Sequence, residues 1–394
     1  MDSIFRTAKL IGVITLIFLF SICSSKHPKV ERLMEDGVEV VINQLEPYKI
    51  KGEPSSLHLE EEFSIDTERD EIAEIGLFDI YGFDIDSEGN VYFFQRPMQK
   101  GQLVYRFDNK GNFSNSFGIT GQGPGEVVAP INAYISGRDE ILIQDYSKFK
   151  LFHFNKKGVL NKETQIMLKS SQLFHLFPLE NDNYLKYIDN FDVSSKHRFD
   201  SLELCDSEFQ LLMELDRCDY GPAFIANQTK RTGSPRVFIY QIKDENIFVG
   251  HESRGYEILL FDLDGNCIRK IRKQYEPVKP PQEFIDNLLG NMGRFKDRVI
   301  IPDAMPPFHY FFLDDTGRLY VKTHEKGINE NEYIHDIFDP EGVFIARKSM
   351  TSFSKWMYPG QSLNNAKAKN GHFYCIREKE SGYKELVVYK MNWE

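Results

Sequence analysis

Residues 107–111 read FDNKG, and the same pattern recurs at 154–158 (FNKKG), 261–265 (FDLDG) and 338–342 (FDPEG). Each copy follows one strand-like run and precedes another. Asp or Asn beside Gly suits a tight β-turn, because Gly tolerates positive φ and the Asx side chain bonds its own backbone. The pattern therefore predicts a series of β-hairpins.

A second series of turns alternates with the first along the chain. In six places a Gly or a polar pair leads into an alternating apolar strand: DSEGNVYFF (86–94), GRDEILIQD (137–145), ENDNYLKYI (180–188), KDENIFVGH (243–251), DDTGRLYVK (314–322) and AKNGHFYCI (368–376). The first series has a degenerate member, CDSEF (205–209), which lacks the glycine. Four-stranded units repeating every forty-odd residues are typical of a β-propeller. We therefore predict an all-β, six-bladed propeller of four-stranded antiparallel blades.

The ends of the chain suggest how the ring closes. The last unit, from 368 onward, supplies three strands, and SLHLEEEFSI (56–65) is a strand-like run that can supply the fourth. Pairing these two segments would remove the open edges of the ring. The arm GVEVVINQLEPYKIKGE (37–53) is expected to lie outside as an extended strap. The predicted division is a signal at 1–22, an arm at 23–55 and the propeller at 56–394.

The N-terminal segment has the layout of a secretory signal. Arg6 and Lys9 precede the apolar run LIGVITLIFLFSI (10–22), which is shorter than the roughly 20 residues needed to span a bilayer. Cys23 follows directly and resembles the acylated cysteine of a bacterial lipobox, although Phe20 and Ile22 depart from its usual residues. We expect a lipid-anchored protein of the cell envelope, facing the periplasm or carried on the outer membrane. An uncleaved short membrane anchor is the alternative.

The net charge limits the classes of partner, and the cysteine content limits what can be predicted about disulfides. The formal net charge of −11 argues against nucleic acid, which requires a basic face. The even number of cysteines after Cys23 permits disulfides, but their scatter through strand-like runs is equally typical of buried thiols. No bridge is therefore predicted among Cys205, Cys218, Cys267 and Cys375.

Several stretches resemble a known family. FDNKGNFSNSFGITGQGPGEV (107–127), GNVYFF (89–94), TGRLYV (316–321) and the arm EDGVEVVINQLEPYKIKGE (35–53) are similar to the six-bladed β-propeller lipoproteins of the NHL-repeat type found in bacterial cell envelopes. The resemblance covers nearly the whole mature chain and implies the fold and export. It departs in blade 3 and in an insertion at 274–300, where PPQEFIDNLLGNMGRF predicts a short helix with Phe284 and Leu288 on one face.

The glycine-rich stretch FGITGQGPGEV (117–127) is interpreted as a link between blades. A phosphate-binding Walker loop needs Lys and Ser/Thr after its last Gly, and Glu126 stands there instead. The stretch is expected to join the outer strand of blade 1 to the inner strand of blade 2.

Long loops are expected together on the face opposite the short turns, where a rigid scaffold usually carries its binding site. They span 96–103, 119–130, 189–200, 216–235, 274–309, 323–334 and 351–365. The candidate ligand-binding residues on them are Arg96, Gln122, Glu126, Tyr220, Arg231, Asp303, His309 and Trp356. The leading hypothesis is non-catalytic binding of a protein, peptide or carbohydrate.

Two other functions remain open at this point. A metal-dependent lyase or hydrolase would use a channel site around His309, with strand-end aspartates such as Asp84, Asp86, Asp145, Asp314 and Asp315. No cofactor is expected under the leading hypothesis, and calcium or zinc under this alternative. No catalytic residue is assigned, since no nucleophile elbow is present. A purely structural scaffold would have a long-loop face without a defined pocket.

Overall fold

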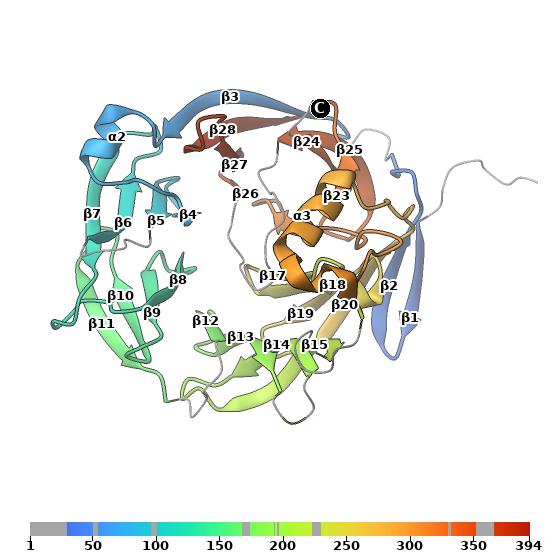
Figure 1. Ribbon diagram of the computed structural model, residues 1–394, viewed down its shortest axis with the longest axis horizontal. Coiled ribbons are helices and arrows are strands. Elements are labelled where there is room, and N and C mark those ends of the chain that lie inside the picture. The colour runs from blue at the N-terminus through green and yellow to red at the C-terminus, as the bar shows by residue number, and fades with distance from the viewer. Residues whose placement is uncertain are drawn as a thin grey trace, which may run out of the picture.

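The computed structural model describes residues 30–49, 54–95, 101–167, 174–192, 194, 197–222, 230–329, 332–351 and 366–394. Strands dominate, and they form six blades of four antiparallel strands arranged around a ring axis (Figure 1). The predicted fold class, an all-β six-bladed propeller, is confirmed.

Each blade runs from its innermost to its outermost strand in chain order, except the last. Blade 1 is β4 (Gly82–Ile85), β5 (Val91–Phe94), β6 (Gln102–Phe107) and β7 (Phe113–Ile119). Blade 2 is β8 (Pro130–Ile135), β9 (Ile141–Asp145), β10 (Lys150–Phe154) and β11 (Leu160–Gln165). Blade 3 is β12 (Phe174–Pro178), β13 (Tyr184–Phe191), β14 (His197–Cys205) and β15 (Leu211–Pro222).

The remaining blades incorporate strands from the N-terminal side. Blade 4 is β17 (Phe238–Lys243), β18 (Asn246–His251), β19 (Glu257–Asp262) and β20 (Cys267–Lys273), extended outward by β2 (Val38–Asn43) and β1 (Glu31–Glu35). Blade 5 is β22 (Tyr310–Leu313), β23 (Leu319–Lys326), β24 (Glu332–Phe338) and β25 (Phe344–Thr351). Blade 6 is β26 (Ala366–Lys369), β27 (His372–Glu378), β28 (Lys384–Trp393) and β3 (Leu57–Asp66).

Closure by an N-terminal strand is confirmed. β3 pairs antiparallel with β28 from Leu57 opposite Trp393 to Asp66 opposite Glu385, so it supplies the outer strand of blade 6. The arm forms the β1–β2 hairpin, and β2 pairs in parallel with β20. The Asn43 side chain then joins blade 4 to blade 5, because it donates to the Gly342 carbonyl (2.9 Å) and accepts from the Phe344 amide (2.8 Å).

Both predicted turn series join adjacent strands of a blade. In the FDNKG turn, Asp108 accepts hydrogen bonds from the backbone N–H groups of Lys110 and Asn112, while Gly111 adopts a φ of 85°. The degenerate turn of blade 3 keeps the same Asp206 hydrogen bonds, but Phe209 takes the left-handed position with a φ of 64°. In blade 2, Asn155 accepts the equivalent bonds from the Lys157 and Val159 amides, so an Asx side chain, and not the glycine, is common to these turns.

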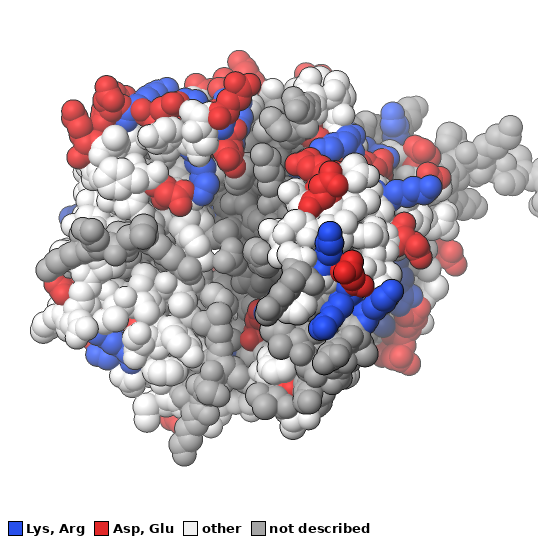
Figure 2. Space-filling view, in the orientation of Figure 1, with Lys and Arg blue, Asp and Glu red and all other residues white. Residues whose placement is uncertain are grey.

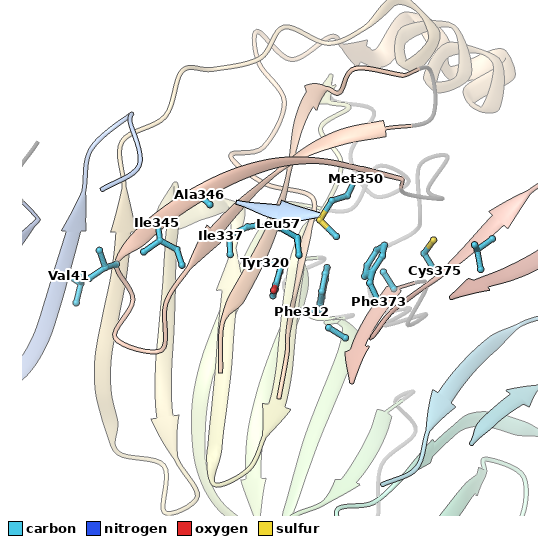
Figure 3. Packing of buried hydrophobic residues seen from close by; sticks show 14 residues of the cluster. Val41, Leu57, Phe312, Tyr320, Ile337, Ile345, Ala346, Met350, Phe373 and Cys375 are labelled. Carbon is cyan, nitrogen blue, oxygen red and sulfur yellow. The ribbon is translucent and has the colours of Figure 1, made fainter. Parts of the chain in front are cut away.

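Hydrophobic packing holds adjacent blades together. In the described residues, a cluster of buried apolar side chains lies at each of the six junctions between blades. At the junction of blades 5 and 6, Phe312 stacks on Tyr320 and Phe373 at ring-centroid distances of 4.9 and 5.6 Å, with Leu57 of β3 in the same cluster (Figure 3). The N-terminal strands are therefore part of the core of the ring.

The connections between blades carry the few helices. α2 (Asp70–Glu74) follows β3, and the 274–309 connection contains α3 (Gln282–Met292), η2 (Gly293–Arg298) and β21 (Val299–Ile300), which pairs with β16 (Arg231–Thr232). A single-turn η1 (Glu252–Arg254) lies between β18 and β19. α3 confirms the helix predicted in the insertion, and its Phe284 is buried. It lies over blades 4 and 5 on the long-loop face (Figure 1).

The glycine-rich stretch 117–127 links β7 of blade 1 to β8 of blade 2, as predicted. Its loop is closed by a hydrogen bond from the Gly121 amide to the Val127 carbonyl (2.9 Å). The Glu126 carboxylate folds back and accepts from the Gly123 amide (2.9 Å). A Cβ atom at position 121 would lie 1.9 Å from that carboxylate, so a larger residue there would displace the Glu126 side chain.

Candidate functional site

A cavity of about 330 Å³ opens on the long-loop face between blades 4 and 5, and we call it the blade 4–5 pocket. It lies where β20 ends and the 274–309 connection begins, and where β23 ends on the neighbouring blade. The pocket is lined by Leu45, Glu46, Tyr256, Lys273, Tyr275, Glu276, Pro277, Val278, Pro306, Pro307, Thr323, His324, Glu325, Asp336 and Arg347. Seven separate segments of the chain thus build one site.

Asp336 of β24 is the centre of the polar floor of this pocket. Its side chain is 1% exposed and lies 3.3 Å from the Lys273 ammonium. It accepts hydrogen bonds from the Tyr256 hydroxyl (2.9 Å) and from Nε of Arg347 (2.9 Å). Buried charges of this kind require a partner with good geometry. The floor is therefore a fixed array of charges contributed by two blades.

The two cations of the floor are held in different ways. Lys273 has a 4% exposed side chain, lies 4.7 Å from the Phe344 ring centroid, and donates to the Gln274 carbonyl (3.1 Å). Arg347 reaches outward, and its terminal nitrogen lies 2.5 Å from Glu325, whose side chain is 42% exposed. Arg347 thus connects the buried floor to the open mouth.

Aromatic and proline side chains form the walls. Tyr256 and Tyr275 lie with ring centroids 6.0 Å apart, and Tyr275 remains 38% exposed. Pro277, Pro306 and Pro307 line the same cavity and stiffen its rim. Apolar walls over a few fixed polar groups are the usual composition of a site for a small ligand.

Protonation in the pocket is set by burial. Burial and the adjacent Asp336 charge raise the pKa of Tyr256 well above its ordinary value, so its hydroxyl remains a donor. Burial, together with the Lys322 charge, lowers the pKa of His324 to about 4, so this imidazole is neutral at physiological pH. The pocket therefore offers both hydrogen-bond donors and acceptors in fixed states.

None of the predicted site residues whose side chains the structure describes lines this pocket. Arg96 and Trp356 lie outside the described residues, and so does Cys23 with the predicted signal segment. Arg231 belongs to β16, and its side chain is likewise outside the description. Asp303 is exposed in the 274–309 connection, away from the cavity.

Gln122 and Glu126 lie in the link between blades 1 and 2, where Gln122 is exposed and Glu126 bonds within its own loop. Tyr220 belongs to a different group between blades 3 and 4. Its hydroxyl donates to Asp200 (2.8 Å), and Arg236 lies 5.0 Å from its ring centroid. The structure does not bring these three candidates together.

His309 directly precedes β22, the innermost strand of blade 5. Its amide donates to the Lys322 carbonyl (2.8 Å), and its ring lies 5.6 Å from that of His324. Burial and the charge of Lys322 hold the pKa of His309 well below its usual range. The part of the chain that the structure describes contains no group of three or more His, Cys, Asp or Glu placed to hold a metal ion.

Several strand-end aspartates have a role in turns. Asp86 accepts from the Glu88 and Asn90 amides (both 2.9 Å), and Asp314 accepts from the Thr316 and Arg318 amides. These aspartates stabilise the turn between the first two strands of blades 1 and 5. The four described cysteines, Cys205, Cys218, Cys267 and Cys375, are free thiols.

The second cavity, about 180 Å³, lies at the opposite, short-turn end of the ring. Inner strands of several blades line it, and Lys367 of β26 pairs there with Asp84 of β4. The Tyr134 hydroxyl donates to the Leu176 carbonyl (2.7 Å) across blades 2 and 3. Because its charged pair is satisfied within the ring, we interpret this end as a structural plug.

Sequence analysis missed the residues that build the pocket because they belong to strands. Lys273, Asp336 and Arg347 lie in β20, β24 and β25, whereas the predicted ligand-binding residues were those of the long loops. A local signal did exist. A charged residue inside a strand that is otherwise buried is uncommon, and such residues are usually paired or functional.

No described helix is long and apolar enough to cross a membrane.

Known proteins resemble this chain mainly in structure. Residues 85–215 match the DUF5128 family, described as a 6-bladed beta-propeller, while no curated protein matches in sequence. A member of the DUF4221 family from Bacteroides vulgatus is similar with a TM-score of 0.53 and 11% identity, covering 86% of this chain and 100% of that one.

Two further solved structures are similar over most of their length. A candidate exported protein from Bacteroides fragilis has a TM-score of 0.46 and 11% identity, covering 90% of this chain and 99% of that one. Virginiamycin B lyase from Staphylococcus aureus has a TM-score of 0.41 and 11% identity, with 84% and 99% covered. The family match and the DUF4221 structure thus agree with the blades described above, and this chain is a six-bladed β-propeller.

Proposed function

We propose that this protein is an exported, lipid-anchored propeller of the NHL-repeat type that binds a small polar ligand in the blade 4–5 pocket without catalysis. The observation that carries the proposal is the pocket floor, where Asp336, Lys273 and Arg347 are fixed across two blades beneath aromatic and proline walls. A purely structural scaffold would not need such a cavity.

The size and chemistry of the pocket favour a saccharide. A volume of about 330 Å³ is at the lower end of the range for ligand pockets, and it suits one or two sugar rings. The charged floor offers paired donors and acceptors to hydroxyl groups, while Tyr275 offers an aromatic face. A short peptide would use the same charges, and the experiment below distinguishes the two.

Among the described residues, no single-sign charge patch dominates the face that carries α3 (Figure 2). Figure 2 shows acidic and basic side chains interspersed over that region. Steering of a highly charged macromolecule needs a field of one sign, so a mixed surface favours a ligand recognised by local contacts. This agrees with the overall net charge of −11, which disfavours nucleic acid.

The test is calorimetric titration of the purified protein with mono- and disaccharides and with dipeptides. Tyr275→Ala should weaken saccharide binding by roughly five- to tenfold, since an aromatic contact contributes on the order of 1–1.5 kcal/mol. Tyr383→Ala is the matched control, because Tyr383 is also a partly exposed tyrosine (46%) but lies on blade 6. Equal saccharide affinities of wild type and Tyr275→Ala would show that the ligand does not bind in this pocket. Binding of dipeptides alone would show that the ligand is a peptide and not a saccharide.

The anchor is tested separately. Metabolic labelling with a fatty-acid analogue should modify the wild-type protein and should fail with Cys23→Ser. Labelling that persists in the variant would contradict attachment at Cys23.

A further inference from the structure

Lys322 is a buried lysine that does not line the blade 4–5 pocket. It lies in β23, its side chain is 2% exposed, and it faces the junction with blade 6. The described residues give its ammonium group neither a carboxylate partner nor a hydrogen bond. Its nearest contacts are aromatic: the ring centroid of Tyr333 lies 4.0 Å from Nζ, and that of Tyr310 lies 5.8 Å away.

Burial without a counter-ion favours the uncharged amine. Among the described residues, the titratable groups beside Lys322 include no carboxylate: they are Tyr310 on β22, Tyr333 and His335 on β24, His309, His324 and Lys326. Burial and the charge of Lys326 lower the pKa of Lys322 to about 7. An unprotonated amine in a water-poor site is a nucleophile.

Two neighbouring imidazoles each present one unprotonated ring nitrogen, and burial makes both weak bases, with the pKa of His324 lowered to about 4 and that of His335 to about 3. Nδ1 of His335 lies 3.1 Å from the Tyr333 carbonyl oxygen, which can only accept, so Nδ1 carries the hydrogen. Nε2 of His335 therefore carries a lone pair, and it is buried without a hydrogen-bond partner among the described residues. His324 bonds the Phe308 backbone, and its Nε2 is likewise buried and without a partner there.

The geometry points to Lys322 as a site of reversible carboxylation by carbon dioxide. Carbon dioxide is small and uncharged, so it can reach a side chain that larger carbonyl compounds cannot. The amine lone pair attacks its carbon, one C=O π pair moves to oxygen, and nitrogen loses one proton. Nε2 of His335 accepts this proton, which leaves a carbamate anion on Lys322.

The carbamate anion on Lys322 would offset the positive charge of the neighbouring Lys326. Lys326 donates to the Tyr333 hydroxyl (3.0 Å) and lies 4.4 Å from the same ring that covers Lys322, so a cation is close to the new anion. Burial first, and then the charge of Lys322, lower the pKa of His335, and the carbamate would reverse the sign of the second effect. Protonated His335 and the carbamate would then stabilise each other.

The test is carbon-13 NMR of the purified full-length protein in ¹³C-bicarbonate at pH 8. A carbamate resonance should appear with wild type and with the control Lys390→Arg, whose lysine is exposed on β28, and it should be lost in Lys322→Arg and in carbon-dioxide-free buffer. His335→Gln should weaken it. A missing wild-type resonance, or one retained by Lys322→Arg, would overturn the proposal.

Chemical trapping keeps the proposal falsifiable if Lys322→Arg does not fold. Triethyloxonium esterifies a carbamate, so mass spectrometry of digested wild-type protein should find the ester on the peptide containing Lys322. An ester found on another lysine instead would assign the carbamate elsewhere and refute the site.

Discussion

Tyr256 of blade 4 donates a hydrogen bond of 2.9 Å to Asp336 of blade 5, across the junction of two blades. The same carboxylate is approached by Lys273 from blade 4 and Arg347 from blade 5. The pocket floor is thus also part of the interface between these blades, and changes in it should affect stability as well as binding.

Replacing Asp336 by Asn should destabilise the protein by about 3–5 kcal/mol, because it leaves the buried Lys273 ammonium without its counter-ion and removes one of the two carboxylate partners of Arg347. Urea unfolding measures this change. Glu341→Gln is the control, since Glu341 pairs with Arg269 but is 62% exposed, and it should cost no more than about 1 kcal/mol. Similar losses in both variants would show that burial does not govern the Asp336 pair.

Two aspartates in equivalent turns should differ because of burial. Asp86 is fully buried and accepts the Glu88 and Asn90 amides and the Tyr92 hydroxyl (3.1 Å). Asp86→Ala should cost about 2–4 kcal/mol, since it orphans several buried donors. Asp108→Ala removes similar backbone bonds where water can replace them, so we expect about 1 kcal/mol. Thermal unfolding of both variants tests the difference, and equal losses would contradict it.

The stability of the blade 3–4 junction should fall as pH rises. Burial raises the pKa of Asp200 to about 6 in the folded protein, despite Arg236, from an ordinary value of 3.8. The folded state therefore binds the proton more tightly than the unfolded state between pH 4 and 6. Ionisation of Asp200 therefore lowers the free energy of unfolding as pH rises through this window. Below about pH 4, where Asp200 is protonated in both states, this loss is absent.

Asp200→Asn should accordingly gain stability relative to wild type as pH rises from 4 to 8, by roughly 2–3 kcal/mol at most. Asn can still accept the Tyr220 hydroxyl bond, so the comparison isolates the charge. The measurement is urea unfolding of both proteins at pH 4, 6 and 8. A constant difference across this range would show that Asp200 does not titrate between the two states.

Two glycines with positive φ should respond differently to alanine. Gly158 in the blade 2 turn has a φ of 79°, and an added Cβ would lie 2.5 Å from the Phe117 ring of blade 1. Gly371 has a φ of 72° but nothing within 4 Å of that position. Gly371→Ala should cost about 1 kcal/mol, and Gly158→Ala about 2–4 kcal/mol because overpacking adds to the backbone strain. Chemical unfolding tests this order.

The fold could be predicted because its signals are local and repeated. An Asp or Asn with its turn hydrogen bonds recurs in successive blades, and even the degenerate turn at Asp206 keeps them. Closure of the ring could be predicted because one strand-like segment before blade 1 had no partner and the last blade lacked one strand. Each of these inferences needs only a few adjacent residues.

The pocket could not be predicted in this way. Lys273, Asp336 and Arg347 belong to three strands, and no spacing in the sequence marks their meeting at one carboxylate. His309 attracted attention by its place before an inner strand, but its surroundings of Lys322 and His324 are set by tertiary packing. Loop residues such as Glu126 serve their own loop instead.

The pairing of β3 with β28 also dictates an order of events during synthesis. Leu57 is made early, but its partner Trp393 is made only after every other blade. β2 likewise waits for β20 of blade 4. A chain that is exported while unfolded can therefore cross a membrane with its ring open, and it acquires its closed form only when the last strand has arrived on the far side.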